Sequence, residues 1–370
     1  MKKILLLLVI FTITVDLWSQ NKSSQPVRIA VVGLSHDHVH WILGRKKTDD
    51  VEVVAIVENN RELAERYSKR YNYPMNIVYP TLDAMYAAIK PEAVVTFTSI
   101  YNHLKVVEFC APRKIHVMVE KPLAVNVEHA KKMIGLAKKH NIHLMTNYET
   151  TWYGSNEKAY ELVSNKDIGD IKKITFHTGH QGPVEIGCSK EFLSWLTDPI
   201  LNGGGAIIDF GCYGANLATW LMKGEKPVSV FAVTNTNKPL VYPKVDDEAT
   251  IILQYKKAQV VIQPSWNWPY SRKDMQVYGT KGFVFCNDAV NMSYSTDNNK
   301  TAATIKAHGL PQKRNDPFTY FANLVRGNIQ QDKFDLSGTT NNEMVVKILQ
   351  AAKQSAKTGR KITWSDYYSE

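Results

Sequence analysis

The chain has 370 residues, of which 44% are hydrophobic and 22% charged, so its composition is that of a globular protein with material for two domains. The formal net charge is +10, but the basic residues are dispersed, which argues against a nucleic-acid-binding protein and leaves an anionic cofactor or a sugar as an adequate partner. The four widely spaced cysteines form no Cys-x-x-Cys pair or disulfide framework, and we expect them in the core.

Residues 1–19 have the pattern of a Sec-type secretory signal peptide. Two lysines precede an apolar run, and Asp16 interrupts that run too soon for a membrane span. The segment contains no twin-arginine pair, and no cysteine follows it as a lipid anchor. We therefore expect an exported, periplasmic protein without a membrane span; the alternative is a buried first helix.

The β-branched run Val27 to Gly33 predicts a buried strand that ends at a glycine, where a dinucleotide-binding fold places its phosphate turn. Ser35 and His38 stand where the second and third glycines of Gly-x-Gly-x-x-Gly would be, so the fingerprint is incomplete. The next predicted strand, residues 51–57, ends at Glu58, near the spacing of the acid that binds the adenosine ribose. A carboxylate there favours NAD over NADP, because it would repel the 2′-phosphate.

Three histidines, His36, His38 and His40, follow the glycine turn and raise the alternative of a metal site. The segment is expected to turn and begin a helix, which would scatter these side chains. We therefore predict phosphate-turn packing or substrate contact, and no metal.

Strand and helix patterns alternate over residues 26–147, which predicts right-handed crossovers and a parallel sheet, that is, a complete Rossmann-type domain. One of its strands lies within residues 91–99, and the segment after it contains Asn102 and His103. We assign residues 26–147 to this dinucleotide-binding domain.

A further buried strand of this domain ends abruptly in Glu120, Lys121 and Pro122. The carboxyl ends of parallel strands face the ligand crevice, so we expect Lys121 to point toward the place where substrate and cofactor meet. A lysine there can donate a proton or a hydrogen bond to a substrate oxygen. The alternative is a lysine that merely caps the strand beside Glu120.

After residue 147 the pattern changes to short, half-buried strands, beginning with residues 171–177. These predict a C-terminal α+β domain, residues 148–370, with an open, mostly antiparallel sheet. The predicted fold class is thus α/β, with an N-terminal Rossmann NAD(P)-binding domain followed by this second domain for substrate and oligomer contacts.

A glycine-rich turn at residues 203–205 leads into a helix on which Asp209, Tyr213, Asn216 and Trp220 follow one stripe. A carboxylate and a phenol one turn apart, with an amide beyond, suit the binding of a polyol, and the phenol can act as acid or base. The alternative is a polar stripe that faces solvent. Four more side chains are candidates for sugar stacking or hydrogen bonding, or for plain packing: Tyr148, His180, Trp195 and Trp266.

Several separate motifs then occur in an order that resembles the glucose-fructose oxidoreductase, inositol dehydrogenase and MocA family (Gfo/Idh/MocA) over nearly all of the chain after the signal. They are Asn102-His103, Glu120-Lys121-Pro122, the segment from Gly203 to Tyr213, the segment from Val277 to Gly282, and the segment from Ser355 to Arg360.

The resemblance implies hydride transfer between a sugar-like carbinol and a nicotinamide, with Lys121, Asp209 and Tyr213 as the catalytic residues. Tyr213 occupies the position of the family's histidine, as in the glucose-fructose oxidoreductase and dihydrodiol dehydrogenase branches. A homo-oligomer through the C-terminal sheet is also implied. The expected cofactor-binding residues are Gly33, Ser35, His36, Glu58, Thr98, Asn102, His103, Glu120 and Lys121.

The predicted function is an NAD-dependent oxidoreductase acting on the CH–OH group of a sugar or glycoside, in which Tyr213, helped by Lys121, takes the hydroxyl proton. Free NAD is expected to be scarce outside the cytoplasm, so the cofactor is expected to stay tightly bound and to be recycled. One alternative is an NAD-dependent glycosidase that oxidises C3 transiently and eliminates the aglycone. The second is a sugar-binding protein without catalysis.

Overall fold

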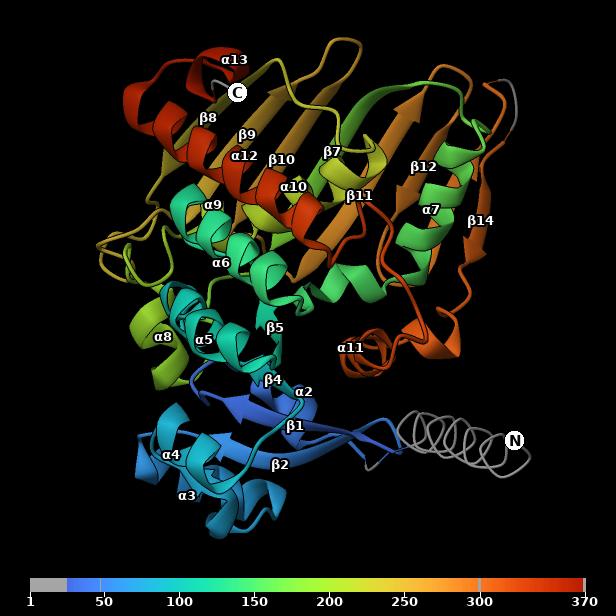
Figure 1. Ribbon diagram of the computed structural model, residues 1–370. Coiled ribbons are helices and arrows are strands. Elements are labelled where there is room, and N and C mark those ends of the chain that lie inside the picture. The colour runs from blue at the N-terminus through green and yellow to red at the C-terminus, as the bar shows by residue number, and fades with distance from the viewer. Residues whose placement is uncertain (1–24, 47, 299–300, 369–370) are drawn as a thin grey trace, which may run out of the picture.

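The computed structural model describes residues 25–46, 48–298 and 301–368 (Figure 1). The predicted signal at residues 1–19 lies outside them. The fold consists of a parallel sheet formed by the first part of the chain and a larger mixed sheet formed by the second (Figure 1).

Six parallel strands form the N-terminal sheet in the order β3-β2-β1-β4-β5-β6. The strands are β1 (Val27–Val32), β2 (Val51–Val57), β3 (Val78–Tyr79), β4 (Ala93–Thr96), β5 (His116–Glu120) and β6 (Leu144–Asn147). The order reverses between β1 and β4, and such a switch point opens a ligand crevice at the carboxyl ends of the strands. The predicted Rossmann sheet is confirmed.

Hydrophobic clusters cover both faces of this sheet, as its nearly continuous apolar strands require. The helices that follow its strands are α2 (Val39–Leu43), α3 (Arg61–Tyr71), α4 (Leu82–Ala88), α5 (His103–Cys110) and α6 (Val127–His140). A late helix, α11 (Pro317–Val325), returns from the C-terminal part of the chain and buries Phe318 and Phe321 in the cluster beside α2 and α3. Arg326, just after α11, pairs with Glu92 before β4 (Nη1 to Oε1, 2.7 Å).

Nine strands form the second sheet in the order β14-β13-β12-β11-β7-β10-β9-β8-β15. Only β7 and β10 pair in parallel among these described strands, so the predicted mostly antiparallel sheet is confirmed. The strands are β7 (Ile171–Gly179), β8 (Ser229–Asn235), β9 (Glu248–Gln254), β10 (Gln259–Ser265), β11 (Arg272–Gly279), β12 (Phe283–Cys286), β13 (Asn291–Ser295), β14 (Ala303–Lys306) and β15 (Ile362–Thr363).

Helices cover one face of the nine-stranded sheet (Figure 1). The remaining helices are α7 (Gly154–Ser164), α8 (Lys190–Leu196), α9 (Ala206–Asp209), α10 (Gly211–Leu221), α12 (Thr339–Thr358) and α13 (Trp364–Tyr367). Buried and half-buried residues alternate along β9, β10 and β12, as expected when only one face packs against helices.

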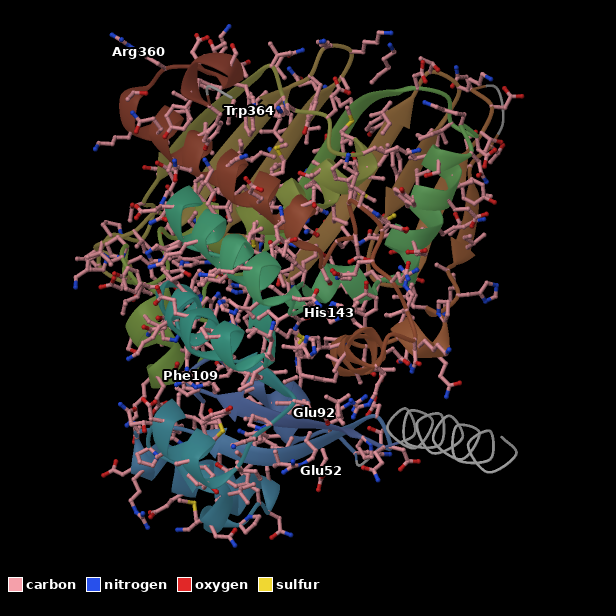
Figure 2. The ribbon with its side chains drawn as sticks, in the orientation of Figure 1. Glu52, Glu92, Phe109, His143, Arg360 and Trp364 are labelled. Carbon is pink, nitrogen blue, oxygen red and sulfur yellow. The ribbon has the colours of Figure 1, made fainter. Side chains whose placement is uncertain are left out.

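The two sheets lie at opposite ends of the molecule (Figure 1). Arg360 and Trp364 mark the far end of the C-terminal part, while Glu52 and Glu92 lie at the Rossmann end (Figure 2). Among the described residues, no helix combines the length and the apolar character that a bilayer crossing needs. The region between the sheets is where a site for two ligands is expected.

Candidate active site

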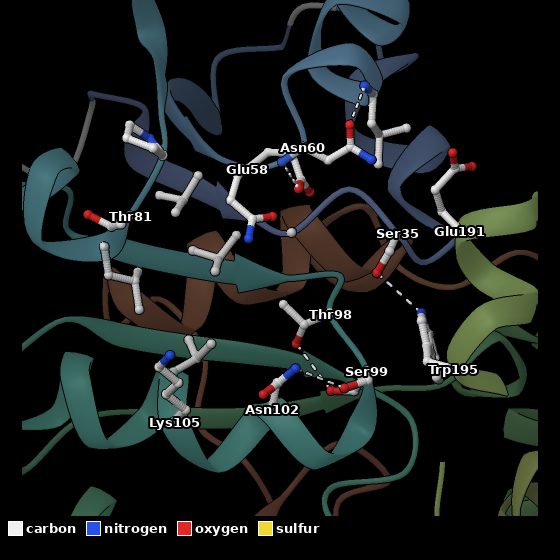
Figure 3. Close-up of a pocket in the computed structure, with 18 of the residues that line it drawn as sticks. Ser35, Glu58, Asn60, Thr81, Thr98, Ser99, Asn102, Lys105, Glu191 and Trp195 are labelled. Atoms are coloured by element: carbon white, nitrogen blue, oxygen red, sulfur yellow. Dashed lines mark hydrogen bonds between the residues drawn. The ribbon is translucent and has the colours of Figure 1, made fainter. Parts of the chain in front are cut away.

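A cavity of about 690 Å³ lies at the carboxyl ends of β1, β2 and β4, at the switch point of the Rossmann sheet (Figure 3). Five of the predicted cofactor-binding residues line it: Gly33, Ser35, Glu58, Thr98 and Asn102. We refer to it as the cofactor pocket.

Gly33 makes the turn after β1 possible. Its φ of +79° lies in the left-handed region, and a Cβ atom there would come within 2.6 Å of Thr98 Cγ2 and 3.1 Å of the Phe97 backbone. The chain can therefore pass close to the neighbouring strand end only with glycine at this position, although the two later glycines of the fingerprint are absent.

Glu58 ends β2 with a carboxylate that the backbone holds in place. Its Oε2 accepts a hydrogen bond from Leu34 N and its Oε1 one from Asn60 N, both at 2.8 Å. The first bond ties the end of β2 to the glycine turn, and the second ties it to the start of α3. The carboxylate thus stands fixed on the wall of the cofactor pocket, where the sequence predicted a ribose ligand.

Helix α8 separates the cofactor pocket from a second cavity. Trp195, which the sequence suggested for substrate contact, lines the cofactor pocket instead, and its Nε1 donates to Ser35 Oγ at 3.2 Å (Figure 3). Phe192 and Leu196 of the same helix line the second cavity. One short helix therefore contributes to both cavities.

The second cavity, which we call the substrate cavity, has a volume of about 360 Å³. The predicted residues Lys121, Asp209, Tyr213, His180 and His36 all line it. They come from the residue after β5, from the end of α9, from the first turn of α10, from the residue after β7 and from the loop after β1. The catalytic residues predicted from the sequence thus converge on one space, together with His180 from the predicted substrate set.

Lys121 and Asp209 form a buried ion pair. The Lys121 ammonium donates to the Asp209 carboxylate through Oδ1 and to the Asp209 carbonyl at 3.0 Å, while Trp266 Nε1 donates to Oδ2 at 3.0 Å. Burial alone would lower the pKa of Lys121, but the charge and hydrogen bond of Asp209 outweigh it and raise that pKa. Burial alone would raise the pKa of Asp209, and the pairing with Lys121 lowers it. Lys121 is therefore a cation.

Tyr213 is 2% exposed and packs against Phe210 and Tyr148, with ring centroids 5.8 and 5.7 Å away. The Lys121 ammonium lies 5.3 Å from the centre of the Tyr213 ring. Burial, together with nearby acidic groups, raises the pKa of Tyr213 well above its ordinary value. The phenol is therefore neutral at pH 7, which disfavours the predicted role as proton acceptor and suits a hydrogen-bond donor.

Asp37, Glu149 and Lys273 are charged residues of the substrate cavity that were not predicted. Glu149 and Lys273 pair at 2.9 Å (Oε2 to Nζ), and Tyr153 donates its hydroxyl to Glu149 Oε1 at 2.5 Å. Burial alone would raise the pKa of Glu149, but Lys273 lowers it. Glu149 directly follows the predicted aromatic Tyr148, so it could have been found; Lys273, in an alternating strand, carries no such signal.

The histidines after the glycine turn are only partly scattered, contrary to the prediction. His36 and His38 have ring centroids 4.4 Å apart and lie beside Glu120, so that one potential ligand atom from each of the three lies within 4.8 Å of the others. His40 instead bonds Tyr71 (Nδ1 to hydroxyl, 2.6 Å). The helix starts only at Val39, which leaves the two earlier side chains free to turn inward.

The hydrogen bonds of this cluster argue against a metal. His36 Nδ1 accepts from the backbone N–H of His38 at 3.0 Å, so the proton of the neutral His36 ring is on Nε2, the nitrogen that faces Glu120. Burial lowers the pKa of His36 well below its usual value, which keeps the ring neutral. The ring therefore offers no lone pair on the side of Glu120.

The other predicted site residues lie behind the cavities. Trp266 donates a hydrogen bond to Asp209. Glu120 and His103 are buried. His103 Nδ1 donates to Leu123 O at 3.2 Å. Tyr148 is buried against Tyr213, with a hydroxyl that has no partner.

Asn216 binds Leu336 O at 2.8 Å, and Trp220 stacks on Tyr160 at 4.1 Å. The predicted stripe thus ends at Tyr213, because Asn216 and Trp220 have partners outside the cavity. At the helical rise of about 1.5 Å per residue they lie about 10 and 16 Å beyond Asp209. The helix itself is broken at Phe210. The helix is buried throughout, so its polar residues do not face solvent either.

A dinucleotide fits the cofactor pocket. The pocket lies at the switch point, it contains the close-packed glycine turn, and a fixed carboxylate follows β2. The substrate cavity adjoins it on the other side of α8, with Lys121 at the end of β5. This arrangement places the two ligands of a dehydrogenase next to each other.

Comparisons with known proteins agree with this geometry. Residues 27–148 match the family described as "Oxidoreductase family, NAD-binding Rossmann fold", and residues 156–285 match "GFO/IDH/MocA C-terminal domain". A trans-1,2-dihydrobenzene-1,2-diol dehydrogenase from Xenopus tropicalis is 29% identical over 239 residues, covering 64% of this chain and 67% of that protein.

Two solved structures have the same fold. One is an aldose-aldose oxidoreductase from Caulobacter crescentus complexed with glycerol, with a TM-score of 0.76 and 22% identity, covering 92% of this chain and all of that one. The other is an inositol dehydrogenase homologue from Azotobacter vinelandii complexed with NAD+, with a TM-score of 0.77 and 16% identity, covering 92% and 98%. The chain therefore belongs to the Gfo/Idh/MocA family of NAD(P)-dependent oxidoreductases that act on CH–OH groups.

Proposed function

We propose that the protein oxidises a secondary alcohol of a sugar or glycoside and that its NAD stays bound and is recycled. The observation that carries this proposal is the buried Lys121–Asp209 pair with Tyr213 beside it, in a cavity that adjoins the dinucleotide pocket. The related proteins are named as an aldose-aldose oxidoreductase, an inositol dehydrogenase homologue and a dihydrodiol dehydrogenase. These names support a polyol-like substrate.

NAD, when bound, supplies the acceptor for the carbinol hydride. The protein's part is to hold and polarise the substrate oxygen. Lys121, a cation in a buried site, and Tyr213, a neutral phenol, would each donate a hydrogen bond to that oxygen, and Asp209 orients the ammonium. Two donors at an oxygen that becomes more negative during reaction stabilise the transition state more than the ground state.

The preference for NAD over NADP rests on Glu58. Its carboxylate is fixed by two backbone N–H groups on the wall of the cofactor pocket, so it cannot easily swing away from a 2′-phosphate. A titration that gave tighter binding of NADP than of NAD would contradict this assignment.

Export and cofactor recycling form the second part of the proposal. The signal-like residues 1–19 support export. The contact of Trp195 with Ser35 joins α8 to the glycine turn beside the cofactor pocket, and it supports slow release of a bound dinucleotide. Detection of the chain in a periplasmic fraction, with residues 1–19 removed as judged by mass spectrometry, would test export.

A panel of glucosides, galactosides and N-acetylated glycosides tests the proposed reaction. A keto-sugar formed together with reduced nicotinamide supports the oxidoreductase. Free aglycone without net reduction would instead identify the NAD-dependent glycosidase. Binding of a glycoside without either product would leave a sugar-binding protein.

We also propose a homo-oligomer through the open face of the nine-stranded sheet. Tyr278, Phe283 and Phe285 form an aromatic cluster on that face, half-buried in the single chain. Phe285→Glu should convert an oligomer to monomers in light scattering without loss of helical content. A monomeric native protein would contradict the proposal.

A further inference from the structure

Oxidation of a carbinol releases a proton, and the charged groups of the substrate cavity leave few acceptors for it. Lys121 and Tyr213 keep their own protons at pH 7. The two carboxylate oxygens of Asp209 accept from Lys121 and Trp266, and those of Glu149 accept from Tyr153 and Lys273. These four groups hold the substrate or each other.

Other groups of this cavity are excluded by their hydrogen bonds or their surroundings. His180 Nδ1 accepts from Gly182 N at 3.0 Å, so the proton of the neutral ring is on Nε2, as it is in His36. Burial lowers the pKa of His180 to about 4 and raises that of the Cys188 thiol to about 12. Asp37 accepts from Ser189 N at 3.0 Å through Oδ2. Its Oδ1 has no hydrogen-bond partner, but it is buried below the cavity surface, where a substrate hydroxyl does not reach it.

His38 differs from these groups because a carboxylate holds its Nδ1. The distance from His38 Nδ1 to Glu120 Oε2 is 2.9 Å, and Glu120 is 1% exposed. An ionised carboxylate can only accept, so Nδ1 of His38 carries a proton and, in the neutral ring, Nε2 holds the lone pair. Nε2 lies on the side of the ring away from Glu120, and His38 lines the substrate cavity with 21% of its side chain exposed.

Packing fixes this dyad. Glu120 Oε1 accepts from Asn147 Nδ2 at 2.8 Å, and Asn147 Oδ1 in turn accepts from Trp152 Nε1 at 3.0 Å. The indole of Trp41 stacks on the His38 ring with centroids 3.9 Å apart and planes 16° apart. The carboxylate on one side and the indole face on the other fix the orientation of the imidazole.

The charged and titratable neighbours of His38 come from three elements. Glu120 belongs to β5, Glu149 to the short helix after β6, and His36 and His40 to the same segment as His38. Two of the four are carboxylates and the other two are histidines whose pKa burial lowers. The cations Lys121 and Lys273 line the same cavity.

We propose that Nε2 of His38 accepts the proton that the substrate hydroxyl loses, with Glu120 and Asn147 as positioning residues. The O–H bond breaks, its electron pair becomes the second carbonyl bond, and the proton goes to Nε2; the C–H pair leaves as the hydride that the family's reaction delivers to the nicotinamide. The imidazolium then returns its proton to solvent, because 21% of the His38 side chain is exposed. The inference rests on the proposed dehydrogenase function.

The first test needs no substrate. In protein with ¹⁵N-labelled histidine, the neutral His38 ring should show the Nδ1–H tautomer, while His36 and His180 show the Nε2–H tautomer. The His38 signals are identified as the set that is absent from the spectrum of the His38→Gln variant. In Glu120→Gln the preference of His38 for the Nδ1–H tautomer should weaken. An Nε2–H tautomer for His38 in the native protein would overturn the proposal.

The second test measures turnover of bound NAD with the glycoside that the native enzyme oxidises most rapidly. His38→Gln should lower kcat by about 10²-fold or more and remove the acidic limb of its pH profile, while the affinity for NAD stays the same. Imidazole added to His38→Gly should restore part of the rate in a saturable manner. His40→Gln is the matched control, because His40 bonds Tyr71 and lines neither cavity, and it should keep the native rate and profile.

The outcomes separate the two proposals. A native enzyme that oxidises no glycoside contradicts the proposed function, whereas the tautomer measurement still judges His38 alone. An active native enzyme whose His38→Gln variant keeps both rate and pH profile, or whose His38→Gly variant gains nothing from imidazole, contradicts the role of His38.

Discussion

The two cavities differ in how the chain builds them. In the cofactor pocket, Gly33 and Glu58 follow directly on strand ends, and the Glu58 carboxylate is held by backbone N–H groups. The substrate cavity depends on side-chain pairs between distant segments: Lys121 and Asp209 are 88 residues apart, and His38 and Glu120 are 82 apart. Substitutions in the first should therefore change cofactor affinity, and substitutions in the second should change turnover.

The largest effect is expected for Lys121→Met, which should lower turnover by about 10²–10³-fold or more while NAD remains bound, because a cationic donor to the substrate oxygen is lost. The measurement is reduction of nicotinamide by a glycoside, together with the amount of dinucleotide released on denaturation. Full activity in this variant would remove Lys121 from the mechanism.

A stability control is needed because Lys121→Met leaves Asp209 buried without its cation, which costs about 3–5 kcal/mol of unfolding free energy. Lys121→Met combined with Asp209→Asn should recover much of that stability in urea titration but none of the turnover. Recovery of turnover in the double variant would show that Lys121 matters only for folding.

Tyr213→Phe should separate turnover from stability more cleanly than Lys121→Met does. The ring should keep its packing against Phe210 and Tyr148, and only a hydrogen-bond donor is lost, so kcat should fall about 10- to 100-fold with little change in melting temperature. An unchanged kcat would show that the phenol does not reach the substrate.

The sequence predicted the Rossmann strands well because nearly continuous apolar runs between glycine, proline and polar turns determine a buried parallel sheet locally. The ends of β2 and β5 therefore placed Glu58 and Lys121 correctly on the two cavities. Lys273 and the inward turn of His38 depend on which distant elements meet, and no local pattern contains that information. The contacts of Asn216 with Leu336 and of Trp220 with Tyr160, which end the predicted stripe at Tyr213, likewise depend on distant parts of the chain.

In the cofactor pocket, Glu58→Gln should weaken NAD binding about 10-fold and narrow the difference between NAD and NADP, because the carboxylate charge is lost. Isothermal titration with both dinucleotides measures this, and kcat at saturating cofactor should stay near the native value. A variant with native NAD affinity would show that the Glu58 carboxylate only holds the glycine turn and does not contact the dinucleotide.

Buried histidines should make the protein less stable in mild acid. Burial lowers the pKa of His103, His116 and His180 to about 4, against 6.5 for the exposed group, so the unfolded chain binds more protons between pH 6.5 and 4. The free energy of unfolding should therefore fall as pH falls through that window and be independent of these groups above it. Urea titrations at several pH values give the free energy of unfolding as a function of pH. In His103→Gln this free energy should fall less steeply between pH 6.5 and 4 than in the native protein. An equal pH dependence would show that His103 does not contribute.

The smallest effect is expected for Trp195→Phe, which removes the hydrogen bond to Ser35 and keeps most of the ring. NAD should dissociate roughly 2- to 10-fold faster, as measured by stopped-flow chase, with kcat almost unchanged. A dissociation rate equal to the native one would show that the contact between α8 and the glycine turn does not retain the cofactor.

The most direct measurement is the state of the dinucleotide in freshly purified protein. Denaturation should release about one NAD per chain, and a glycoside added to intact protein should reduce that bound NAD and yield an equal amount of keto-sugar. Protein that retains no dinucleotide, or whose bound NAD no glycoside of the panel reduces even transiently, would contradict the account of an exported dehydrogenase with a resident cofactor.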